Sequence, residues 1–177
     1  MARTLVGTLL LVMAAGAIDS LGACGDKYLK VGKGTRIRAY QSIHPASILV
    51  YRSAKSTAEG VKFYDELLRG AGHSPVFVKH GTPLADVFAG GKYDLVIADY
   101  ADAQAVSAQL QPVAGRPDVL PILNQPTKAT AAEAARQYQF LLTPGKMTKY
   151  DALDQIDHLM ERRLANTAAA GRSTKGN

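Results

Sequence analysis

The feature that most constrains this chain is a regular alternation, beginning at residue 46, of short apolar runs and longer segments with helical periodicity. The predicted strands are residues 47–51, 75–80, 93–99, 119–123 and 140–142. Most of these runs are apolar along nearly their whole length, which is typical of parallel strands covered on both faces. The sequence therefore predicts a parallel sheet whose strands are connected by helices.

The segments between the strands carry start signals for helices. The predicted helices are residues 56–72, 82–91, 101–110, 130–139 and 148–164. Two capping boxes, Ser56 with Glu59 and Thr130 with Glu133, predict two of the starts, and Thr82 as N-cap predicts a third. Right-handed crossovers between these elements give an α/β fold with a doubly wound, five-stranded parallel sheet, for which we expect the flavodoxin-like order 2-1-3-4-5.

The N-terminal segment has the layout of an export signal. Arg3 precedes an apolar run at 5–18 that is too short for a comfortable membrane span, and small residues then lead to the only cysteine, Cys24. The stretch LGAC, which ends at Cys24, resembles the lipobox of bacterial lipoproteins. The resemblance implies a lipidated Cys24 and a protein held at the bacterial cell envelope, facing the periplasm or the exterior. An ordinary secretory signal peptide and an uncleaved anchor are the alternatives.

The chain divides into four predicted parts. Residues 1–23 are a lipoprotein signal peptide, 24–45 a tether rich in glycine and basic residues with a short strand at 28–31, 46–165 the folded domain, and 166–177 a disordered tail. Part of the net charge of +6 lies in the C-terminal segment, so it does not form a single basic face. The sequence contains no tryptophan and no nucleic-acid-binding motif, which disfavours nucleic acid as a partner. Attraction to anionic lipid headgroups is the better use of the excess charge.

Three stretches of the folded domain resemble the receiver domain of two-component response regulators. They are ILVYRS at 48–53, YDLVIADY at 93–100, and QFLLTPGKMTKYDALDQIDHLMERR at 139–163. The resemblance covers residues 46–164 and implies a receiver-like sheet. It also implies a phosphoacceptor at Asp99, two acidic residues after the first strand that hold Mg²⁺, and a lysine before the proline that follows the fifth strand.

The residues that would carry this chemistry are replaced. Arg52 and Ser53 stand where the acidic pair would be, and Lys55 lies close by. An arginine cannot ligate Mg²⁺, because its guanidinium is always protonated and offers no lone pair. Thr143 stands before Pro144 in place of the lysine. We therefore expect a domain without phosphoryl transfer, without a metal site and without a cofactor, and not an enzyme.

Asp99 alone matches a working receiver residue. It ends a central strand, where α/β sheets form their crevice, and we expect it to form an ion pair with Arg52. The alternatives are that Asp99 caps the next helix or faces solvent, or that it is a phosphoacceptor after all. The hydroxyl position of receivers falls on Asn124 or Thr127, and the sequence leaves this choice open.

Two other classes of function compete with the prediction that the domain binds an unidentified envelope protein. A flavodoxin-like domain would bind the phosphate of FMN or another anion through Ser53, Ser56 and Thr57 at a helix N-terminus, although that loop lacks glycine. A hydrolase would need a nucleophile–base pair, and none is visible in the sequence. No metal-ligand spacing joins the four histidines, His44, His73, His80 and His158.

Overall fold

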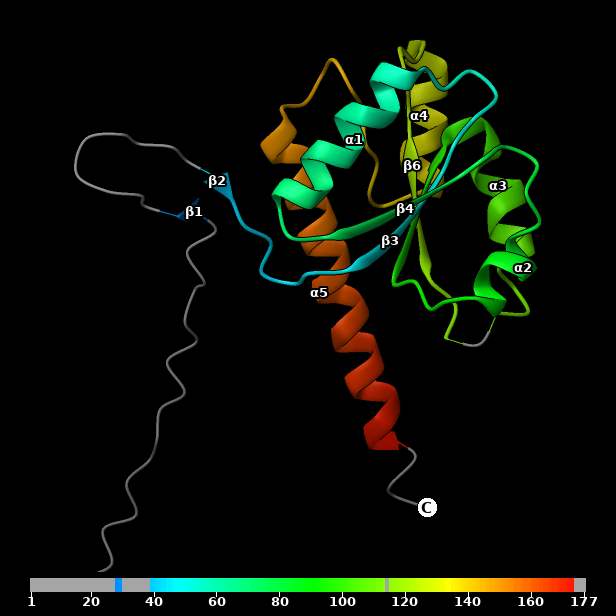
Figure 1. Cartoon of the computed structure of the whole chain (residues 1–177), viewed down its shortest axis with the longest axis vertical. Coiled ribbons are helices and arrows are strands. Elements are labelled where there is room, and N and C mark those ends of the chain that lie inside the picture. Colours follow the sequence, from blue (N-terminus) through cyan, green and yellow to red (C-terminus); the bar gives the residue numbers. More distant parts are fainter. Residues whose placement is uncertain (1–27, 30–38, 114, 174–177) are drawn as a thin grey trace, which may run out of the picture.

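The computed structural model describes residues 28–29, 39–113 and 115–173 of the chain (Figure 1). Its main sheet contains four parallel strands, namely β3 (Ser47–Tyr51), β4 (Ser74–Val78), β5 (Leu95–Asp99) and β6 (Asp118–Ile122). They lie in the order β4-β3-β5-β6. In order of appearance along the chain this is 2-1-3-4, which confirms the predicted α/β class and parallel sheet and is compatible with a flavodoxin-like arrangement.

The two central strands are buried because helices cover both faces of the sheet. Ile48 and Val50 of β3 pack into one apolar cluster with side chains from α1 (Ala58–Gly70) and α5 (Lys149–Ser173). Leu49 of β3 packs into a second cluster with side chains from α2 (Leu84–Ala89) and α3 (Tyr100–Gln109). Figure 1 shows α1 and α5 on one side of the sheet and α2 and α3 on the other. The uninterrupted apolar runs of the sequence follow from this burial.

The predicted fifth strand is reduced to a single parallel bridge between Ile122 and Leu142. Leu142 donates its N–H to the carbonyl of Pro121 at 2.9 Å, and Leu123 donates to the carbonyl of Leu142 at 2.7 Å. The segment thus lies next to β6, where a fifth strand would be placed, but the ladder does not extend. Its chain turns away immediately, since the Thr143 N–H donates to the sulfur of Met147 and the sheet gains no further pairing there.

The helices occupy the predicted places, but their starts differ by a few residues. The fourth, α4, is Lys128–Gln137. The N-caps are Thr57 for α1 and Thr127 for α4, whose hydroxyl oxygens accept from the N–H of Gly60 and Thr130, each at 3.1 Å. The predicted capping boxes were therefore wrong in register. Pro83, not Thr82, is the N-cap of α2.

The last helix is longer than predicted. Helix α5 continues to Ser173, so residues 166–173 are helical and not part of a disordered tail. Figure 1 shows this end of α5 projecting beyond the other elements.

The end of the predicted tether packs against the domain. Strand β1 (Tyr28–Leu29) pairs antiparallel with β2 (Ala39–Tyr40). The side chains of Tyr40, the last residue of β2, and of Ser42 are buried. The hydroxyls of Tyr40 and Ser42 both donate to the carboxylate of Asp157 on α5, which is fully buried. A buried carboxylate needs such donors, so residues 39–45 belong to the folded domain and correct the predicted boundary.

Candidate functional site

The carboxyl ends of β3, β5 and β6 open into a crevice of about 580 Å³. The loop between β3 and α1 and the first turn of α3 contribute to its walls. Ligands of parallel α/β sheets bind at this edge, because the helix N-termini and the loops that follow the strands converge there. Four residues of the predicted receiver-like site line the crevice: Arg52, Ser53, Lys55 and Asp99. Ser56 and Thr57, which were predicted for the anion-binding alternative, line it as well.

Asp99 is an N-cap. Its Oδ1 accepts from the N–H of Ala101 at 3.2 Å, and its Oδ2 accepts from Nδ2 of Asn124 at 3.3 Å. Within the described part of the chain, no ion pair joins Asp99 to Arg52. The predicted pair was therefore wrong, and the alternative that Asp99 caps the next helix is confirmed. The reason is local: α3 begins directly after Asp99, so the nearest donor to its carboxylate is a free N–H of the first helical turn.

Arg52 lies in the crevice wall without a side-chain partner for one of its nitrogens. Its backbone N–H donates to the carbonyl of Val78 at 2.9 Å, which fixes the start of the loop against β4. Its Nε is buried and has no hydrogen-bond partner among the described residues. A buried donor on a charged group that is left without an acceptor is costly. Arg52, which lines the crevice, therefore has one buried N–H group that lacks a hydrogen-bond acceptor.

The loop that follows Arg52 brings hydroxyls and a helix start to the same space. Oγ of Ser53 accepts from the N–H of Lys55 at 3.3 Å and lies 3.4 Å from Oγ of Ser56. Thr57 then caps α1. The first turn of a helix favours anions, since its N–H groups and dipole point outward. One wall of the crevice is thus cationic and rich in donors.

The crevice is also lined by residues that the sequence did not single out as site residues. Tyr64 of α1 is partly buried there, and burial, with a smaller contribution from the charge of Asp99, raises the pKa of its phenol to about 12. His80, after β4, approaches Asp102 of α3, with Nδ1 3.8 Å from Oδ2. The ring of Tyr51 meets that of His80 edge-on, with centroids 6.0 Å apart. Tyr64 was recoverable from sequence, because it lies seven residues after Thr57 on the same face of α1.

Of the remaining predicted residues that the structure describes, one lines the crevice and the others lie elsewhere in the fold. Asn124 lines the crevice, whereas Thr127 caps α4, so the choice between them falls on Asn124. Thr143 does not line the crevice, and its carbonyl accepts from the N–H of Lys146 at 3.1 Å in a separate turn. Cys24 lies outside the described residues.

No group of three or more His, Cys, Asp or Glu side chains in residues 28–29, 39–113 and 115–173 is arranged to hold a metal ion. None of the described helices is both long and apolar enough to cross a membrane. The crevice combines two cations, Arg52 and Lys55, with two carboxylates that already have contacts. Asp99 accepts from the N–H of Ala101, and Asp102 is approached by the imidazole of His80. Compared with models of protein families, with curated proteins and with solved structures, the chain matches none of them.

Proposed function

We propose that this chain is a non-enzymatic binding module with a receiver-like domain, held at the bacterial cell envelope by a lipid on Cys24. The observation that carries the proposal is the content of the crevice. Arg52 and Ser53 line it where a receiver would place two carboxylates, and both oxygens of Asp99 accept hydrogen bonds from within the domain. Residues 140–142, which lie beside β6, would complete a five-stranded flavodoxin-like order in this proposal.

Phosphoryl transfer needs features that these residues do not supply. A metal ion normally neutralises the charge on the transferring group, and a guanidinium in the metal's place offers donors and no ligand lone pair. Asp99 would also have to give up its role as the N-cap of α3 to become a phosphoacceptor. The partner of the module is then another envelope protein, bound without any covalent step.

Beryllofluoride with Mg²⁺ tests the absence of phosphoacceptor chemistry. We expect no chemical-shift change at Asp99, Ala101 or Asn124 when the full chain is titrated with both reagents. A Mg²⁺-dependent shift at these residues would make the domain a working phosphoacceptor and would overturn the proposal. If no shift occurs, affinity purification from detergent-solubilised envelope would identify the partner. Arg52→Ala and Lys55→Ala serve as variants of the crevice in the same experiment.

The envelope anchor has its own test. Replacement Cys24→Ala, or treatment with globomycin, is expected to leave a larger precursor and to remove the lipid mass from the mature N-terminus. A mature N-terminus at another residue without lipid would contradict the lipid anchor and leave the binding role of the domain untouched.

The crevice also supports a second candidate, the binding of a small anion such as a phosphate group. The specific observation is the buried Nε of Arg52, which has no acceptor within the described residues and lies beside the start of α1. Titration with inorganic phosphate is expected to shift the amide signals of Arg52 and Thr57. Arg52→Gln should abolish the shifts, and Lys79→Gln, an exposed cation that does not line the crevice, should preserve them. Binding of FMN with appreciably higher affinity than phosphate would favour the flavodoxin-like alternative. If neither phosphate nor FMN shifts these signals, both anion binding and flavin binding are excluded.

A further inference from the structure

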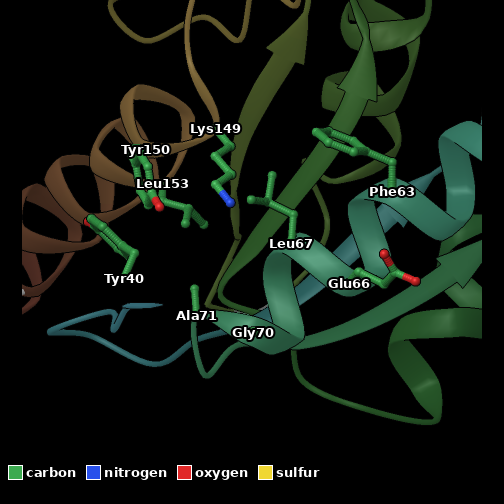
Figure 2. A pocket seen from close by; sticks show the side chains of 9 residues that line it. All are labelled: Tyr40, Phe63, Glu66, Leu67, Gly70, Ala71, Lys149, Tyr150 and Leu153. Atoms are coloured by element: carbon green, nitrogen blue, oxygen red, sulfur yellow. The ribbon is translucent and has the colours of Figure 1, made fainter. Parts of the chain in front are cut away.

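A second hollow, of about 270 Å³, lies between α1 and the first turns of α5 (Figure 2). Its floor is apolar and is formed by Leu67 of α1, Leu153 of α5 and Tyr40 of β2. It shares no lining residue with the crevice at the carboxyl ends of the strands, and the proposed function makes no use of it. The hollow is smaller than most small-molecule pockets, which measure roughly 300–1,000 Å³. It is therefore better matched to side chains of a protein than to a cofactor.

The rim of this hollow carries an exposed aromatic side chain. Phe63 of α1 is 53% exposed, more than any other large apolar side chain whose burial the structure describes. Figure 2 shows Phe63, Glu66 and Leu67 projecting from α1, with Lys149, Tyr150 and Leu153 on the facing part of α5. An exposed aromatic ring beside an apolar hollow is the usual composition of the centre of a protein–protein interface.

The charges at the rim are complementary to each other. Glu66, on the α1 side, is 69% exposed, and its one ion pair within the described residues is a loose contact of 3.8 Å with Lys62, one turn earlier. Lys149, at the start of α5, is exposed and holds its Nζ 5.1 Å from the centre of the Tyr150 ring. The hollow thus has an acidic side and a basic side. A two-fold rotation brings the acidic side of one such surface against the basic side of another.

We propose that the hollow between α1 and α5 is the contact surface between two copies of this chain. In the two-fold dimer, Phe63 of each copy enters the hollow of the other, and Glu66 of each copy faces Lys149 of the other. A surface that carries both the exposed ring and the hollow, together with one charge of each sign, needs no second kind of protein to be complemented. Gly70, at the end of α1, lines the hollow without a side chain, and a Cβ there would meet no atom within 4 Å.

Carbodiimide coupling tests the contact directly, because it joins a carboxylate to an amine only where the two touch. Light and isotopically heavy full-length chains are mixed in a mild detergent, coupled and digested. We expect peptides that link Glu66 of one label to Lys149 of the other. Links confined to chains of the same label would place both groups within one molecule and would overturn the dimer.

A charge exchange provides the decisive control. Glu66→Lys and Lys149→Glu are each expected to weaken dimerisation by about tenfold, because each places like charges together at two symmetry-related positions. The double exchange should recover most of the wild-type affinity. Glu133→Lys, an equal change of charge on α4, should have no effect. Association through the apolar N-terminal segment would be insensitive to all of these variants and so contradicts the proposal.

Two substitutions that alter the shape of the surface are tested in the full chain, with sedimentation as the measure of its oligomeric state. Phe63→Ser removes the inserted ring, and Gly70→Leu adds a side chain at the lining of the hollow, where its Cβ meets no atom within 4 Å. Each is expected to shift the chain toward monomer while the thermal unfolding of the domain changes little. A wild-type chain that remains monomeric at every concentration, or a Lys149 crosslink to a different envelope protein, would overturn the second copy as the occupant.

Discussion

Nδ2 of Asn124 donates to Oδ2 of Asp99 across 3.3 Å, and this bond joins the carboxyl end of β6 to that of β5. The other oxygen of the same carboxylate caps α3. Asp99 therefore holds together three elements at the edge of the sheet where ligands of this kind of fold bind. Its carboxylate has a structural role in the free domain, so the binding that we propose for the crevice would fall to Arg52 and the hydroxyls that follow it.

Replacement of Asp99 by alanine should lower the free energy of unfolding by about 1–2 kcal/mol, the usual cost of a lost N-cap with one further hydrogen bond. Urea unfolding measures it. A double-mutant cycle with Asn124→Ala should give a coupling above about 0.5 kcal/mol, because the two side chains share a bond. The matched cycle with Arg52→Ala should give none. If Asp99 is coupled to Arg52 and not to Asn124, the two charged side chains form an ion pair in solution, and the hydrogen bond to Asn124 is contradicted.

The phenol of Tyr64 should titrate with a pKa of about 12 in the folded domain, against an ordinary value of 10.0, chiefly because it is buried and secondly because Asp99 is near. The unfolded chain then loses this proton first, so the group should reduce stability as the pH rises from 10 toward about 12. Ring resonances of labelled tyrosine report the titration. Asp99→Asn should lower the pKa only part of the way, since burial remains. An unchanged pKa of Tyr64 in that variant would show that the charge of Asp99 does not contribute to the raised pKa.

His73 should make the domain less stable in mild acid. Burial lowers the pKa of its imidazole from 6.5, and the nearby charge of Asp157 opposes this only in part. Below pH 6.5 the unfolded chain therefore takes up a proton that the folded domain does not, and stability falls with falling pH. His73→Gln should flatten this dependence, since glutamine does not titrate. An equal slope in the variant and the wild type, measured by urea unfolding between neutral and mildly acidic pH, would refute the prediction.

The buried carboxylate of Asp157 should be among the most sensitive positions of the domain. Asp157→Ala leaves the hydroxyls of Tyr40 and Ser42 without the acceptor that they share, and we expect a loss of about 3 kcal/mol. Asp157→Asn keeps an acceptor and should cost less. Glu161→Ala, an exposed acid on the same helix, should change the free energy of unfolding by less than about 0.5 kcal/mol.

Hydrogen exchange adds a local reading of the Asp157 variants. Protection of the Ser42 N–H, which donates to the carbonyl of Ala71 at 2.9 Å, should fall more than protection of β3. Uniform loss of protection would mean that Asp157 supports the whole core and not the attachment of residues 39–45 in particular.

Much of the architecture was predictable because it depends on local composition. The strand at 47–51 and the end of the strand at Asp99 agree with the structure, since continuous apolar runs with polar ends mark buried strands directly. The register of the caps was less predictable. Ser56 and Thr57 are adjacent hydroxyls, and only the direction in which the chain leaves β3 decides that Thr57 bonds to Gly60. Thr127 displaced Thr130 at α4 for the same kind of reason.

The sequence by itself determined which residues meet at the edge of the sheet, because the ends of parallel strands come together whatever the details of packing are. It therefore placed Arg52, Ser53 and Asp99 in one crevice. Only the tertiary structure decided how they pair. A hydrogen bond depends on a few tenths of an ångström and on direction, and these are set by the helix that begins after Asp99 and by the loop that carries Asn124. The buried Nε of Arg52 and the attachment of residues 39–45 to Asp157 are decided in the same way, by contacts between segments far apart in the chain.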